Sequence, residues 1–181
     1  MTIKVLLVYH SDEGQTAKVA LHIGARLRDL GAVVDIATAE DEPSPEGYDG
    51  MIVGDSIHVG HHSRELRRWL VRHRDDFGAM PVALFQVSLT SAKDDDDSVH
   101  EANRLVAELL GETGLDPDLV GLFAGALAFT RYGWFKRRMM TRIAAADGRD
   151  TDTSVDHEYT DWEAVDHFAD DAYSLISGGV R

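Results

Sequence analysis

The sequence predicts an open α/β fold with three layers, in which helices cover both faces of a doubly wound, parallel, five-stranded sheet. Five short apolar runs are spread along the chain, and such runs are typical of strands buried on both faces. Amphipathic helical patterns alternate with these runs, which favours parallel strands joined by right-handed crossovers. Neither an internal repeat nor a linker interrupts the alternation, so we expect a single domain over residues 1–181.

Each of the five apolar runs has the length of a strand and carries few charges. In chain order they span residues 3–9, 33–37, 49–54, 81–87 and 120–126. A doubly wound sheet of this size takes the strand order 2-1-3-4-5. Its ligand site lies at the carboxyl ends of the strands, so we expect the loops after the first, third and fourth strands to meet there.

Helical periodicity separates the runs, because apolar residues recur there at intervals of three and four. The apolar stripes consist of Val19, Ala20, Ile23, Leu27 and Leu30; of Leu66, Trp69, Leu70 and His73; of Leu105, Val106, Leu109 and Leu110; and of Trp162, Val165, Phe168, Ala169, Tyr173 and Ile176. Two stretches depart from this pattern. One is the acidic run Asp94–Asp97, which we expect to be a solvated loop because its like charges repel one another.

The other departure is an insertion after the fifth strand, at about residues 128–159. Ordinary connections in such folds take about 2–6 residues. No acidic residue occurs from Leu119 to Ala146, and cations and aromatic residues gather there: Arg131, Tyr132, Trp134, Phe135, Lys136, Arg137, Arg138 and Arg142. A buried strand and a packed helix would also lack acids. We favour a surface that meets an anionic, apolar partner or a membrane.

The composition limits the class of protein. The net charge is −14, from 22 Asp and 10 Glu against 4 Lys and 14 Arg. The scarcity of Lys and the excess of Asp favour adaptation to high salt over a merely solubilising surface, and they argue against nucleic-acid binding. The absence of cysteine excludes disulfides and thiolate catalysis. No apolar stretch approaches the roughly 18–20 residues that cross a bilayer, so we expect a soluble, cytoplasmic protein.

The loop His10–Thr16 joins the first strand to the first helix and is the best candidate for a binding site. Ser11, Gly14, Gln15 and Thr16 lie where backbone N–H groups and the helix dipole favour a phosphate. The loop has no Lys or Arg, so it is no Walker motif, and it has no Gly-x-Gly-x-x-Gly pattern. A simple helix cap is the alternative. The complete strand–loop–helix context favours a phosphate monoester.

Two further loops could wall a slot beside the phosphate loop, because they follow the third and fourth strands. They contain Ser56, Ile57, His58, Val59, Gly60 and His61, and Ser88, Leu89, Thr90 and Ser91. We do not expect a metal site at His58, His61 and His62, for which the sequence offers no identifiable carboxylate partner. No Gly-x-Ser-x-Gly nucleophile motif occurs either. We therefore expect no catalytic side chain, and a bound cofactor must carry the reaction.

Several stretches resemble a known family. Ser11–Thr16 resembles the loop that binds the FMN phosphate in flavodoxins, which indicates a flavodoxin-like fold. More specifically, the chain resembles the menaquinone-dependent protoporphyrinogen IX dehydrogenases, a flavodoxin-type family. The matching stretches follow the same order along nearly the whole chain and cover residues 12–16, 54–61, 124–127, 131–135, 151–153 and 159–163.

This resemblance implies an FMN enzyme that oxidises protoporphyrinogen IX and passes electrons to a membrane quinone in heme biosynthesis. The FMN phosphate would lie on Ser11, Asp12, Glu13, Gly14, Gln15 and Thr16, and the flavin ring between the two wall loops. The basic, aromatic insertion would meet the substrate or the inner face of the cell membrane.

The chain also departs from the family pattern. His10 and Glu13 stand where hydroxyl residues are often found, and neither wall loop offers a Trp or Tyr to stack on the flavin. An open flavin face fits an enzyme better than an electron carrier. The alternatives are an electron-transfer flavodoxin, an FMN-dependent quinone or small-molecule reductase, and a regulatory module that docks through the insertion.

Overall fold

The computed structural model of the chain describes residues 2–58, 60–89, 96–127, 134–146, 148–149 and 151–179. Its main sheet has five parallel strands in the order β2-β1-β3-β4-β5. These strands are β1 (Lys4–Tyr9), β2 (Val33–Thr38), β3 (Gly50–Ser56), β4 (Val82–Ser88) and β5 (Leu119–Ala124). The predicted fold class and strand order are confirmed, and the strand ends differ from the prediction by one or two residues.

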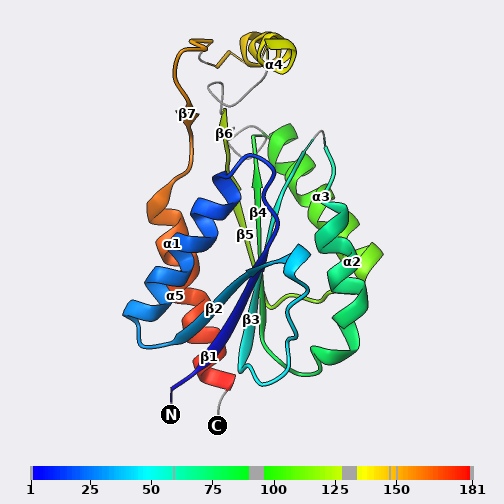
Figure 1. Cartoon of the computed structure of the whole chain (residues 1–181), viewed down its shortest axis with the longest axis vertical. Helices are drawn as coiled ribbons and strands as arrows, with labels where there is room; N and C mark the ends of the chain where they lie inside the picture. The colour runs from blue at the N-terminus through cyan, green and yellow to red at the C-terminus, as the bar shows by residue number, and fades with distance from the viewer. Residues whose placement is uncertain are drawn as a thin grey trace.

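Helices form the outer layers. They are α1 (Gln15–Asp29), α2 (Arg64–His73), α3 (Asp96–Thr113), α4 (Trp134–Ala146) and α5 (Trp162–Gly179), with short 3-10 helices η1 (Ala39–Asp41) and η2 (Arg74–Asp76). Helices α1 and α5 cover one face of the sheet, and α2 and α3 cover the other (Figure 1). The two outer layers bury the sheet on both sides, as the apolar runs predicted.

Successive side chains of each strand enter different cores, because they point to opposite faces of the sheet. Leu7 of β1 packs in the core under α1 and α5, whereas its neighbour Leu6 packs in the core under α2 and α3. Both side chains are fully or almost fully buried. The cores hold the sheet rigidly, so the loops at its carboxyl edge are positioned by packed strands.

The acidic run was predicted to be a loop, and for two of its residues this is wrong. Asp96 and Asp97 form the start of α3, while Asp94 and Asp95 lie outside the described residues. Both side chains are exposed, as a solvated run requires. Carboxylates are stabilised in the first turn of a helix by its dipole, which explains why charge repulsion does not prevent the helix here.

The fifth apolar run also differs from the prediction, because it breaks at Gly125. Beyond the break, β6 (Ala126–Leu127) leaves the main sheet and pairs antiparallel with β7 (His157–Glu158). This pair carries the insertion beyond the carboxyl edge of the sheet, where α4 lies (Figure 1). The buried side chains of Leu127 and Ala144 pack there in a small cluster.

Candidate functional site

The loop between β1 and α1 leaves the N-terminus of α1 open. Gly14 is the N-cap with a φ of 92°, a left-handed conformation that favours glycine. Its N–H donates to Ser11 Oγ at 3.0 Å, so the serine closes the loop. No side chain within the described chain caps α1, and its first turn contains no acid. Backbone N–H groups that no side chain caps, together with the buried Thr16, fit an anionic group at this helix end.

Gln15 has a structural partner that the sequence did not suggest. Its side-chain amide donates to Thr160 Oγ1 at 2.8 Å, and this hydroxyl donates in turn to the Ala124 carbonyl at 2.7 Å. The side chain of Gln15 thereby ties the start of α1 to the segment that follows β7. Its contribution to anion binding would come from its backbone.

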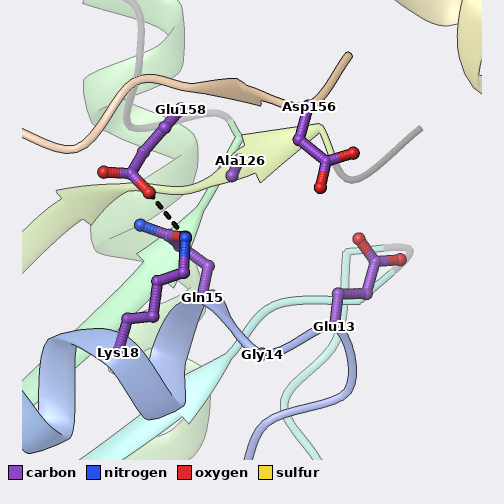
Figure 2. A pocket seen from close by; sticks show the side chains of 7 residues that line it. All are labelled: Glu13, Gly14, Gln15, Lys18, Ala126, Asp156 and Glu158. Atoms are coloured by element: carbon purple, nitrogen blue, oxygen red, sulfur yellow. Dashed lines mark hydrogen bonds and ion pairs between the residues drawn. The ribbon is translucent and has the colours of Figure 1, made fainter. Parts of the chain in front are cut away.

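A hollow beside this loop has an acidic lining. It is bounded by Glu13, Gly14, Gln15, Lys18, Ala126, Asp156 and Glu158 (Figure 2). Lys18 Nζ lies 2.9 Å from Glu158 Oε2, and Glu13 extends away from the start of α1 toward Asp156. Burial alone would raise the pKa of Glu158, but hydrogen bonds from Lys18 and Trp162 outweigh it and lower the pKa. Glu158 therefore holds β7 against α1 as a carboxylate.

The loop after β3 is held by a buried carboxylate. Asp55 is fully buried and lies 2.9 Å from His62 Nδ1, while its oxygens accept the N–H groups of Ser56 and Ser63 at 3.0 and 2.9 Å. His62 Nε2 lies 3.1 Å from the carbonyl oxygen of Leu105. His62 therefore spans the Asp55 carboxylate and the Leu105 carbonyl, and its ring links the end of β3 to α3.

This buried pair closes a tight turn. His58 and His61 exchange two backbone hydrogen bonds, of 3.0 and 3.2 Å, and Gly60 has a φ of 74°. No carboxylate partner for the histidines was expected from the sequence, and this expectation is wrong for His62, whose partner is Asp55. Within the described residues, no group of three or more His, Asp or Glu side chains could hold a metal ion.

The predicted loops meet at the carboxyl edge of the sheet. The Ser56 hydroxyl donates to Asp12 Oδ2 at 3.3 Å, which joins the loop after β3 to the loop after β1. The N–H of Ile57 donates to the Val87 carbonyl at 2.9 Å, which joins it to the end of β4. Ser88 is buried, whereas Val59, Thr90 and Ser91 lie outside the described residues.

The insertion contacts the loop after β4 partly through Arg149, which the sequence did not single out. Arg149 donates to the Leu89 carbonyl and lies 5.6 Å from the centre of the Tyr159 ring. Leu89 also packs against the cluster of Leu127 and Ala144. A cation and an apolar cluster therefore couple the insertion to this loop.

The predicted insertion residues are described only in part. Arg138 and Arg142 are exposed on α4. Trp134, Phe135, Lys136 and Arg137 begin the same helix, but their side chains lie outside the described part, as do Arg131 and Tyr132 entirely. Across the described ranges, no helix is long and apolar enough to cross a membrane.

Comparisons with known proteins agree with this geometry. The flavodoxin domain family matches residues 6–154. The protoporphyrinogen IX dehydrogenase (quinone) of Escherichia coli K12 is 32% identical over 169 residues, which cover 92% of this chain and 93% of that protein. The protein of the same name from Leishmania major is 34% identical over 175 residues, covering 95% and 75%.

A solved structure shares the fold. An archaeal flavodoxin has a TM-score of 0.52 at 17% identity, and the alignment covers 99% of this chain and 100% of that one. The flavodoxin domain match points to flavin mononucleotide (FMN) as the cofactor of this chain, and an open helix terminus suits its phosphate.

Proposed function

The chain belongs to the flavodoxin domain family and, within it, to the protoporphyrinogen IX dehydrogenases (quinone), and we propose that it is an FMN-dependent enzyme that catalyses the reaction for which this group is named. It would oxidise protoporphyrinogen IX to protoporphyrin IX in successive two-electron steps and reduce a quinone. The observation that carries this proposal is the extent of the similarity. It covers 92% of this chain and 93% of the Escherichia coli protein, so it includes the insertion as well as the sheet.

The proposed roles at the cofactor follow from the loops. Ser11 and Gly14 shape the turn that presents the N–H groups of α1 to the FMN phosphate. The loops that begin at Ser56 and at Ser88 would flank the flavin ring, because they meet beside this turn. FMN supplies the redox chemistry when it is bound, and the protein supplies position and electrostatics.

The proposed substrate surface is the insertion. It packs onto the loop after β4 through Leu89 and Arg149, so a molecule on this surface would also face the flavin site. Exposed cations on α4, Arg138 and Arg142, suit the carboxylates of a porphyrin or an anionic lipid surface. We therefore include peripheral contact with the inner face of the cell membrane, where the quinone dissolves, in the proposal.

Two measurements on the purified full chain test the proposal. Its visible spectrum should show bound flavin, or should acquire it when FMN is added. Incubated anaerobically with protoporphyrinogen IX and a soluble menaquinone analogue, the FMN-loaded protein should form fluorescent protoporphyrin IX. A reaction without protein and one with an equal concentration of free FMN are the controls. FMN-loaded protein that forms no more protoporphyrin than free FMN does would refute the activity.

A further inference from the structure

The phosphate loop carries an electrostatic problem. Asp12 and Glu13 lie within it, and it contains no Lys or Arg. A phosphate monoester has a charge of about −1.5 to −2 at pH 7, so carboxylates beside it oppose binding. Glu13 extends away from the start of α1, but the side chain of Asp12 reaches from the loop to Ser56.

Both oxygens of Asp12 are engaged. Oδ2 accepts from the Ser56 hydroxyl at 3.3 Å, and Oδ1 lies 3.4 Å from His10 Nε2. These contacts hold the carboxylate toward the end of β3. They also place its charge next to the one histidine that stands in the predicted phosphate loop.

His10 lies between two carboxylates. Its Nδ1 is 2.6 Å from Glu40 Oε1, and its Nε2 faces Asp12. A neutral imidazole donates from only one nitrogen, whereas ionised carboxylates can only accept. Two carboxylate partners therefore favour the imidazolium. Only 12% of the His10 side chain is exposed, so water competes little for these hydrogen bonds.

The surrounding charges support this protonation state. Burial alone would lower the pKa of His10, but the hydrogen bonds with Glu40 and Asp12 and the negative charges of Glu40 and Asp55 outweigh it. The pKa therefore lies above its ordinary value. The groups that face His10 come from three elements, since Glu40 lies in η1, Asp12 in the loop after β1 and Asp55 in β3.

We propose that His10 is a positioning residue for the cofactor phosphate: its imidazolium bridges Glu40 and Asp12, offsets one negative charge beside the phosphate loop and thereby helps the loop to retain FMN. Loss of the proton leaves a ring nitrogen without hydrogen against a carboxylate, and the loop then gains one negative charge. FMN binding weakens accordingly as the pH rises. This inference rests on the proposed function only in naming FMN as the ligand.

The FMN phosphate has its own ionisation near pH 6, which must be separated from that of His10. The comparison of wild type with H10Q does this, because both proteins bind the same phosphate. Riboflavin provides a second control, because it carries the same ring without the phosphate. D12N removes the carboxylate that His10 neutralises and keeps the proposal testable if H10Q folds poorly.

The experiment measures the dissociation constants of FMN and riboflavin for the full chain, stripped of flavin, from pH 6 to pH 9 by flavin fluorescence. For FMN, the ratio of the wild-type to the H10Q constant should rise about fivefold over this range, as expected for loss of one nearby, partly screened charge. For riboflavin the ratio should stay constant. The ratio of the wild-type to the D12N constant for FMN should also rise between pH 6 and pH 9, because D12N lacks the carboxylate whose charge His10 offsets, and this comparison does not require H10Q.

Two results would overturn the inference. One is an FMN ratio that does not change with pH, and the other is an equal rise for riboflavin, which would assign the effect to the ring site. Failure to bind FMN at every pH would reject the proposed function together with this inference. Binding of FMN with a ratio that does not change with pH would reject the inference alone.

Discussion

The carboxylate of Asp55 and the imidazole of His62 form a buried pair, with Asp55 Oδ2 2.9 Å from His62 Nδ1 and at most 3% of either side chain exposed. The pair joins the end of β3 to the start of α2 across the turn at His58–His61. Since Asp55 also accepts the N–H groups of Ser56 and Ser63, a single carboxylate fixes both ends of a loop that we place beside the flavin.

D55N should therefore destabilise the protein strongly. The amide that replaces the carboxylate brings an N–H₂ group against the N–H donors of Ser56 and Ser63 and removes the buried charge that His62 contacts. Breaking a buried pair in this way costs about 3 kcal/mol of the free energy of unfolding. Urea unfolding of the flavin-free chain measures the loss.

D166N is the matched control for this substitution. Asp166 lies 2.8 Å from His22, but 46% of its side chain and 39% of the histidine's are exposed. Exposed pairs contribute about 1 kcal/mol or less, so D166N should cost far less than D55N. Equal losses in the free energy of unfolding would show that burial of the Asp55–His62 pair does not increase its contribution to stability.

His10 should make stability depend on pH above neutrality. Burial lowers its pKa, but Glu40, Asp12 and Asp55 together leave the pKa raised in the folded chain. Protons therefore bind the folded state more tightly than the unfolded state. The resulting stabilisation is complete below the ordinary pKa of about 6.5 and is lost as the pH rises through the folded pKa.

The measurement is the melting temperature of the flavin-free protein at a series of pH values from 6 to 9. Wild type should exceed H10Q most at pH 6, and the difference should shrink toward pH 9. A difference that is constant or that grows with pH would contradict a raised pKa.

The fold was predictable because its signals are local. Runs such as residues 3–9 are apolar throughout, and the helical stripes repeat every three or four residues, so each element is visible in a short window. Strands β6 and β7 have two residues each, which is too short for any period, and they pair across the insertion. The break at Gly125 was missed because the two residues of β6 continue the apolar run and show no period of their own.

The candidate site was predictable where one continuous loop or the strand order of the sheet determines it. Gly14 and Thr16 follow a strand and precede a helix, and that order of residues is itself the signal. The contact of Lys18 with Glu158 joins residues 140 positions apart, so no spacing reveals it. The burial of Asp55 could not be predicted for a different reason. An aspartate at the end of a strand is expected to be exposed, and only the folded structure shows that His62 is its buried partner.

The acidic surface predicts that salt stabilises the protein. With a net charge of −14, repulsion between carboxylates opposes the compact state, and salt screens it. The screening length falls from about 10 Å at 0.1 M salt to about 3 Å at 1 M. The melting temperature should therefore rise with KCl. A sucrose series of equal osmolarity is the control, because sucrose stabilises proteins by exclusion from their surface without screening charge. Stability that is unchanged between low and molar KCl would refute adaptation to salt.

The insertion should bind anionic membranes through α4. Arg138 and Arg142 are both exposed on this helix, and each arginine near an anionic surface contributes about 1 kcal/mol. R138A/R142A should then weaken binding to phosphatidylserine-containing vesicles by about 2 kcal/mol, or roughly thirtyfold. Co-sedimentation with vesicles at low ionic strength measures this, and vesicles of phosphatidylcholine alone should bind neither protein.

R72A/R74A removes the same number of charges elsewhere and serves as the control. Arg72 lies in the last turn of α2 and Arg74 begins η2, with 55% and 59% of their side chains exposed. Helix α2 ends at the opposite edge of the sheet from α4 (Figure 1). If net charge alone governs attraction, both double variants lose vesicle binding equally. A loss confined to R138A/R142A assigns the contact to α4, because long-range charge is the same in the two proteins.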